Sequence, residues 1–107
     1  KAATKFAYGN DQLEGKRILV QGIGHVGEEL VRLASEEGAN VVISDINEER
    51  LSEVSTKYGV DIYIEKKYYE IFSEKIEVKE TYKTFESYDD LVILLEKNNF
   101  YYDLKAK

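Results

Sequence analysis

Three closely spaced glycines, Gly22, Gly24 and Gly27, are the residues of this sequence whose type and spacing suggest a chemical task. Between a strand and a helix, Gly22 would allow the tight turn, Gly24 would let the backbone approach a pyrophosphate, and Gly27 would let the helix lie close to the strand. The phosphates would lie at the helix N-terminus, where unpaired N–H groups and the positive end of the dipole favour an anion. The spacing therefore predicts a dinucleotide-binding turn.

The elements around the glycines agree with this prediction. Residues 17–20 form a short apolar run typical of a buried parallel strand, and residues 25–37 have the periodicity of a helix that Gly38 ends. Four apolar residues are expected on the buried face of that helix: Val26, Leu30, Leu33 and Ala34. Residues 40–45 read as a second buried strand that ends in Asp45.

Asp45 follows the glycines at close to the roughly 20-residue separation at which an acidic side chain binds the adenosine ribose. A carboxylate there favours NAD over NADP, because a 2′-phosphate would meet like charge. His25 is interpreted as a residue whose backbone N–H faces phosphate, since no nearby carboxylate would tune its side chain as a base. The predicted cofactor-binding residues are Gly22, Ile23, Gly24, His25, Val26, Gly27, Asp45 and Ile46.

Three stretches of the sequence resemble one family. Residues 12–16, 20–27 and 44–47 look like the nicotinamide-binding domain of the glutamate, leucine, phenylalanine and valine dehydrogenases, and the leucine dehydrogenase branch is the most similar. Residues 1–9 look like the end of the helix that leads into this domain in that family. The resemblance covers residues 1–64, and residues 65–107 diverge.

The resemblance implies NAD as cofactor and oxidative deamination of an L-amino acid by hydride transfer. In the family a separate N-terminal domain carries the catalytic lysine and aspartate, and nothing in these 107 residues matches it. We therefore expect no catalytic residue and no deamination by this chain alone, which reads as a piece of a longer enzyme. The alternative is a non-catalytic nucleotide-binding or structural module, either truncated, recombined or designed.

Further elements are expected along the rest of the chain. Asn47 is predicted to cap a helix that buries Leu51, Val54 and Tyr58 and ends at Gly59, before a third, alternating strand over residues 60–64. After Gly59 the sequence contains neither glycine nor proline. The expected elements there are a helix over 65–73 that buries Tyr68, Tyr69 and Phe72, a strand over 75–79, a helix over 91–97 capped within 87–90 with Tyr88, Leu91, Val92 and Leu95 on one face, and a strand over 100–104.

The pattern predicts an α/β fold, a Rossmann-like doubly wound parallel sheet in three α/β/α layers, with residues 1–107 as a single domain. The net charge of −6, without a basic cluster, makes nucleic acid or a membrane surface an unfavourable partner. The absence of cysteine excludes disulfides and thiolate zinc sites, and no metal site is predicted. We expect a cytoplasmic protein whose partner is a dinucleotide, and leave open a homo-oligomer or a missing catalytic domain.

Overall fold

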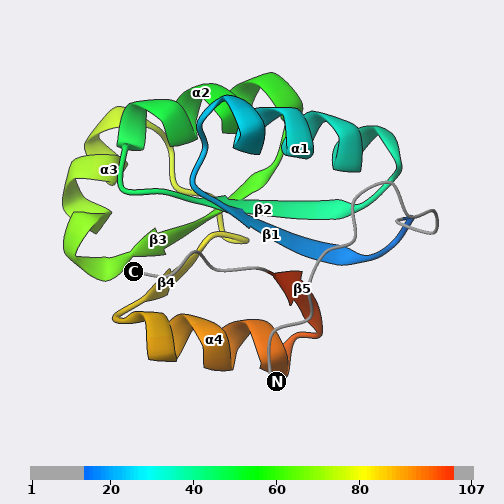
Figure 1. Ribbon diagram of the computed structural model, residues 1–107. Coiled ribbons are helices and arrows are strands. Elements are labelled where there is room, and N and C mark those ends of the chain that lie inside the picture. Colours follow the sequence, from blue (N-terminus) through cyan, green and yellow to red (C-terminus); the bar gives the residue numbers. More distant parts are fainter. Residues whose placement is uncertain (1–13, 103–107) are drawn as a thin grey trace.

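The computed structural model describes residues 14–102, which form one five-stranded sheet with helices on both faces (Figure 1). The strands are β1 (Arg17–Gln21), β2 (Asn40–Ser44), β3 (Asp61–Glu65), β4 (Lys83–Phe85) and β5 (Phe100–Tyr102). The helices are α1 (His25–Glu36), α2 (Glu48–Tyr58), the 3-10 helix η1 (Lys66–Tyr68), α3 (Tyr69–Lys75) and α4 (Tyr88–Lys97). The predictions for residues 1–13 and 103–104 lie outside the described residues.

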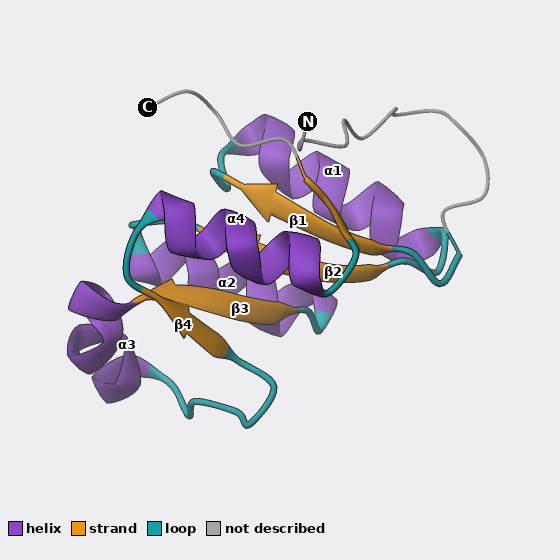
Figure 2. Cartoon of the chain, turned by 90° about the horizontal axis from the view of Figure 1, so that it is seen from below, coloured by secondary structure: helices purple, strands orange, loops and turns teal. Residues whose placement is uncertain are grey.

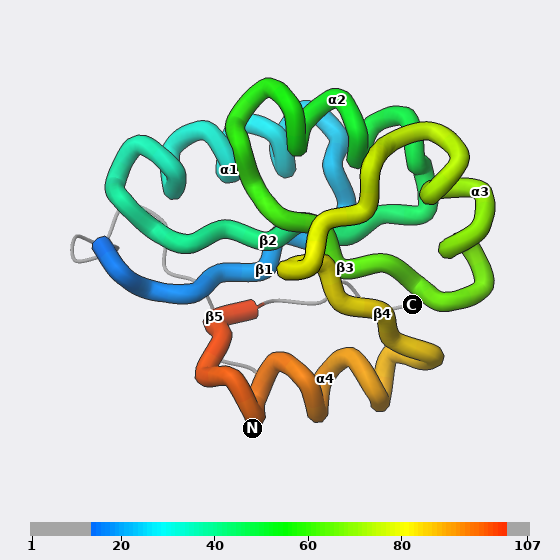
Figure 3. The backbone as a smooth tube through the Cα atoms, turned by 180° about the vertical axis from the view of Figure 1, so that it is seen from behind, coloured from blue at the N-terminus to red at the C-terminus, as the bar shows by residue number. Residues whose placement is uncertain are grey.

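The sheet is parallel throughout, in the order β4-β3-β2-β1-β5. From β1 to β4 the chain moves in one direction across the sheet, and α1 and α2 cover one face (Figure 3). It then returns across the whole sheet to β5, and α4 covers the opposite face (Figure 2). Right-handed crossovers require this change of face when the direction reverses. The predicted Rossmann-like α/β/α fold is therefore confirmed.

Two apolar cores lie on either side of the sheet, and β3 contributes to both. Ile62 and Ile64 pack in the core beneath α1 and α2, whereas Tyr63 packs in the core against α4. All three side chains are buried, and the strand predicted over residues 60–64 is present one residue farther along the chain. Both faces of an internal parallel strand are covered by helices, and neither side needs polar residues.

The elements of the first half lie where the sequence predicted them, with one shift on α1. Val26 is 83% exposed, although it was expected on the buried face, while Val31 and Ala34 are fully buried. The stripe that faces the sheet starts at Gly27, because α1 lies against the glycine turn there and turns Val26 towards solvent. On α2 the expected Leu51 and Val54 are buried, and Tyr58 is half-buried.

Residues 65–82 differ from the prediction. Phe72 on α3 is buried as expected, but Tyr69 is exposed, and α3 continues to Lys75. The strand predicted over 75–79 was wrong, since the next strand is β4, farther along the chain. Ile76 and Val78 instead pack from a loop against the core beneath α1 and α2. Their alternation reflects packing of a loop on the core, which produces the same sequence pattern as a paired strand.

The last helix, α4, begins and ends as its sequence indicates. The Ser87 side chain accepts a hydrogen bond from the Asp90 N–H, and Asn99 follows the helix with a φ of 62°. Leu91 and Leu95 are fully buried against the sheet. Tyr88 was expected on the same buried face but is exposed, because it stands at the first position of the helix, beyond the edge of the core.

Candidate functional site

The glycine turn joins the carboxyl end of β1 to α1. Gly22 has a φ of 85°, a conformation that side chains disfavour, and its N–H donates to the Ser44 carbonyl at the end of β2 over 2.9 Å. A Cβ atom on Gly27 would lie 2.2 Å from the Gly22 carbonyl oxygen. Gly22 therefore turns the chain and Gly27 admits the helix against the turn, the tasks that their spacing predicted.

Gly24 is the N-cap residue of α1, and no side chain caps this helix. The first intrahelical bond runs from the Glu28 N–H to the Gly24 carbonyl, so the N–H groups of His25, Val26 and Gly27 precede the helical ladder. A Cβ atom on Gly24 would meet nothing within 4 Å. The start of α1 is thus an open stretch of backbone donors, with His25 and Val26 exposed beside it.

Asp45 ties the end of β2 to the glycine turn. Its Oδ2 accepts a hydrogen bond from the Ile23 N–H at 2.7 Å. Its Oδ1 accepts from the N–H groups of Ile46 at 2.6 Å and Asn47 at 3.2 Å. A carboxylate has about four lone-pair directions, so one further donor can be accommodated. The same contact means that the Ile23 N–H, predicted to face phosphate, is already used within the protein.

Arg50, on the first turn of α2, is a site residue that sequence reasoning missed. Its Nε donates to the Ile23 carbonyl at 2.9 Å, and its Nη2 donates to Glu28 Oε1 at 2.8 Å. Its Nη1 donates to Glu53 Oε1 at 3.1 Å. The place of Arg50 in the sequence could have indicated this role. The helix after the second parallel strand begins at the same edge of the sheet as the glycine turn, so side chains of its first turn can reach that turn.

Glu28 is the centre of an ionic network between α1 and α2. Its Oε2 accepts from Lys57 Nζ at 3.1 Å and from the Tyr58 hydroxyl at 3.0 Å, while Oε1 takes the bond from Arg50. These bonds, that of Arg50 foremost, lower the pKa of Glu28 to about 2. The same contacts raise the pKa of Arg50 and of Lys57, in each case chiefly through Glu28. The network therefore stabilises the charged form of each of the three groups.

A shallow groove of about 850 Å³ lies between the glycine turn and the start of α2. Its lining comprises four of the predicted residues, Ile23, Gly24, Asp45 and Ile46, together with Asn47, Glu48, Glu49 and Arg50. Ile46 is 63% exposed and offers the groove an apolar surface. Lys75 Nζ lies 3.6 Å from Glu49 Oε2 and 3.9 Å from Glu48 Oε2, which offsets part of the negative charge on the rim.

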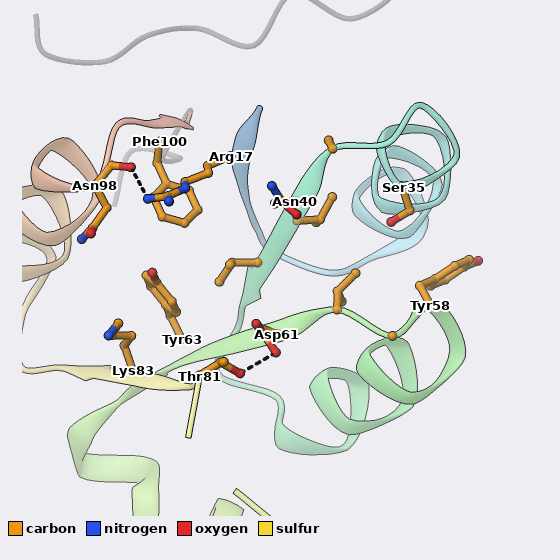
Figure 4. Close-up of a pocket in the computed structure, with 15 residues that line it drawn as sticks. Arg17, Ser35, Asn40, Tyr58, Asp61, Tyr63, Thr81, Lys83, Asn98 and Phe100 are labelled. Atoms are coloured by element: carbon orange, nitrogen blue, oxygen red, sulfur yellow. Dashed lines mark hydrogen bonds between the residues drawn. The ribbon is translucent and has the colours of Figure 1, made fainter. Parts of the chain in front are cut away.

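A second groove, of about 570 Å³, lies at the opposite, amino edge of the sheet (Figure 4). The first residues of the strands line it, among them Arg17, which donates to the Asn98 carbonyl at 3.0 Å, and Asp61, which accepts from the Thr81 hydroxyl at 2.9 Å. The carboxyl ends of α1, α2 and α4 point to this edge, where the negative ends of their dipoles disfavour a phosphate. None of the predicted site residues lines it.

Residues 14–102 contain neither a metal-binding cluster nor a membrane-spanning helix. Within that range, no group of three or more His, Cys, Asp or Glu side chains could hold a metal ion. The helices in the same range are too short or too polar for any of them to span a membrane. The groove at the glycine turn is thus the place where the predicted residues and an open backbone meet.

Comparison with known proteins identifies relatives among the amino-acid dehydrogenases. The chain is 41% identical to the leucine dehydrogenase of Thermoactinomyces intermedius over 71 residues, which are 66% of this chain and 19% of that enzyme. It is 48% identical to the leucine dehydrogenase of Bacillus subtilis over 59 residues, which are 55% of this chain and 16% of that enzyme. For the phenylalanine dehydrogenase of Thermoactinomyces intermedius the identity is 42% over 59 residues, with the same two shares.

No family model matches the chain. The crystal structure of L-tryptophan dehydrogenase from Nostoc punctiforme aligns with a TM-score of 0.46 at 18% identity, over 85% of this chain and 34% of that one. The chain spans less than a fifth of the length of the leucine and phenylalanine dehydrogenases named above. Over 55% to 66% of its own length, this chain is similar in sequence to leucine and phenylalanine dehydrogenases.

Proposed function

We propose that this chain is the NAD-binding domain of an L-amino-acid dehydrogenase, in which residues 1–107 form one domain that binds the dinucleotide at the glycine turn. The observation that carries the proposal is the backbone around Gly24, where α1 starts without a side-chain cap and a Cβ would meet nothing within 4 Å. A pyrophosphate needs this combination of space and N–H donors. The similarity to leucine dehydrogenases supports an amino acid as the substrate of the whole enzyme.

Each predicted residue has a role in this proposal. The N–H groups of Gly24, His25 and Val26 bind the pyrophosphate, while Gly22 and Gly27 shape the turn. Asp45 uses its remaining lone pair for a ribose hydroxyl, and the exposed side chain of Ile46 packs against the adenine. Ile23 lines the groove but does not bind the pyrophosphate through its N–H, because that N–H donates to Asp45.

The contribution of this chain to the reaction is binding and orientation. When bound, the nicotinamide would supply the hydride chemistry at the α-carbon of an amino acid, which is a property of the cofactor and not of this chain. No side chain in the groove is assigned as a nucleophile or base, and the exposed imidazole of His25 stands at the start of α1. A catalytic domain outside these 107 residues supplies the groups that act on the amino acid.

The test is a calorimetric titration of the 107-residue chain with NADH. We expect binding to the native chain and none to Gly24→Val, because a branched side chain would occupy the space that the pyrophosphate needs. The Gly24 backbone has a φ of −90°, which valine adopts, so circular dichroism of that variant should match the native chain. A folded native chain that does not bind NADH would refute the proposal.

A non-catalytic structural module is the second candidate, and one observation favours it. Three backbone N–H groups already occupy the Asp45 carboxylate, so this acid stabilises the fold without any ligand. In that case the glycine turn has only a structural role and binds no cofactor. Loss of stability in Asp45→Ala, with no NADH binding to the native chain, is the result that this candidate predicts.

A further inference from the structure

The groove beside the glycine turn contains two side chains that favour opposite cofactors. An acid at the end of the second strand, here Asp45, suits the free 2′-hydroxyl of NAD, whereas an arginine nearby suits the 2′-phosphate of NADP. Asp45 and Arg50 both line the groove. The choice of cofactor therefore depends on whether the guanidinium of Arg50 is available to a ligand.

We propose that Glu28, assisted by Glu53, is the residue that makes this groove selective for NADH, because the two carboxylates neutralise Arg50. The inference rests on the proposed function, since it concerns the same groove. It assigns specificity to a residue of α1 that does not line the groove itself.

The hydrogen bonds of Arg50 carry the inference. A guanidinium has five N–H donors, and each of the three nitrogens of Arg50 donates at least one hydrogen bond. One bond goes to Glu28 Oε1 at 2.8 Å, one to Glu53 Oε1 at 3.1 Å and one to the Ile23 carbonyl at 2.9 Å. Both terminal nitrogens already bind a carboxylate, so a 2′-phosphate would compete with Glu28 and Glu53 for the charge of Arg50.

The surroundings of Glu28 keep its carboxylate in place. Lys57 and Tyr58 hold its second oxygen, and only 22% of its side chain is exposed. The carboxylates of Asp45, Glu48 and Glu49 line the groove, and Lys75 offsets the last two only from the rim. With Arg50 neutralised, the three carboxylates of the lining repel a phosphate and tolerate a hydroxyl.

The experiment compares NADH and NADPH affinity in the native chain, Glu28→Gln and the double variant Glu28→Gln with Arg50→Gln. Freeing Arg50 should strengthen NADPH binding about threefold to tenfold while NADH affinity changes less than about twofold. The double variant should lose this gain, because the released cation is gone. Glu29→Gln is the matched control: it removes the same charge one residue away, from a carboxylate that pairs with Arg32.

The outcomes of this experiment distinguish a failure of the inference from a failure of the proposed function. A folded Glu28→Gln that binds NADH but gains no NADPH affinity overturns the inference and leaves the proposed function intact. An equal gain in Glu29→Gln also overturns it, since net charge would then be the cause. If Glu28→Gln does not fold, Glu53→Gln removes the second carboxylate from a 65% exposed position, and an NADPH gain there supports the inference while its absence refutes it. A native chain that fails to bind NADH refutes the proposed function itself.

Discussion

The carboxylate of Asp45 accepts a hydrogen bond from the backbone N–H of Ile23 at 2.7 Å, which links the end of β2 to the turn that follows β1. The two residues follow adjacent parallel strands, whose carboxyl ends meet at one edge of the sheet. The bond fixes the glycine turn to the end of β2. An acid that was predicted to bind a ribose therefore also has a structural task.

Asp45→Ala should weaken NADH binding by about 1 to 3 kcal/mol, the range for a lost hydrogen bond to a charged group. It should also lower the free energy of unfolding, because three backbone N–H groups lose their acceptor. Calorimetry and urea titration measure the two effects separately. Asp61→Asn is the control, since this acid binds Thr81 at the opposite edge of the sheet. Native NADH affinity in Asp45→Ala would remove the residue from the binding site.

Gly27→Ala and Gly24→Ala should have very different effects on stability. The new Cβ of Gly27→Ala would lie 2.2 Å from a backbone oxygen, so α1 must move away from the turn, at a cost of about 1 to 3 kcal/mol. The Cβ of Gly24→Ala would enter open space, and the expected cost is less than about 1 kcal/mol. Urea unfolding of both variants tests this, and equal losses would contradict the close approach of α1 to the turn.

Glu28 should make the stability of the chain depend on acid. Its pKa is lowered in the folded protein from 4.5 to about 2, so the carboxylate contributes stability above pH 4.5. That contribution should disappear as the pH falls from about 4.5 to about 2. Thermal unfolding across this range should show a smaller loss of Tm in Glu28→Gln than in the native chain. Glu37→Gln, an exposed charge-matched control, should follow the native curve, and a native-like curve for Glu28→Gln would contradict the ionic network.

The first half of the fold was predictable because its local signals and its tertiary packing agree. Gly38 and Gly59 end α1 and α2 with positive φ values, and Asn47 caps α2 through the Arg50 N–H. A positive φ favours glycine after a helix, and asparagine is one of the residues whose side chain can cap the start of one. The Rossmann-like sheet follows once two such strand–helix units are placed in order.

The second half was less predictable because its elements depend on long-range packing. Ile76 and Val78 alternate like a strand yet pack from a loop, and the short β4 has one buried residue, Phe85. The position of β5 next to β1 comes from the passage of α4 across the sheet, which no local pattern encodes. Arg50 was missed in the same way, since its partners Ile23 and Glu28 lie on the preceding strand–helix unit.

Phe72 and Ile71 provide a test of whether α3 is packed on the sheet. Phe72 is 1% exposed and belongs to the core beneath α1 and α2, whereas the neighbouring Ile71 is 47% exposed. Phe72→Ala should lower the free energy of unfolding by about 3 to 5 kcal/mol, because it removes a large side chain from a filled core. Ile71→Ala, on the same short helix, should cost less than about 1 kcal/mol.

Urea titrations followed by far-UV circular dichroism measure both values, and the comparison within one helix separates burial from helix propensity. A loss of several kcal/mol is a large fraction of the stability of a domain of this size, so Phe72→Ala should unfold at a much lower urea concentration. Equal midpoints for the two variants would mean that α3 is not part of the core. The divergent residues beyond 64 would then contribute less to the fold than their packing indicates.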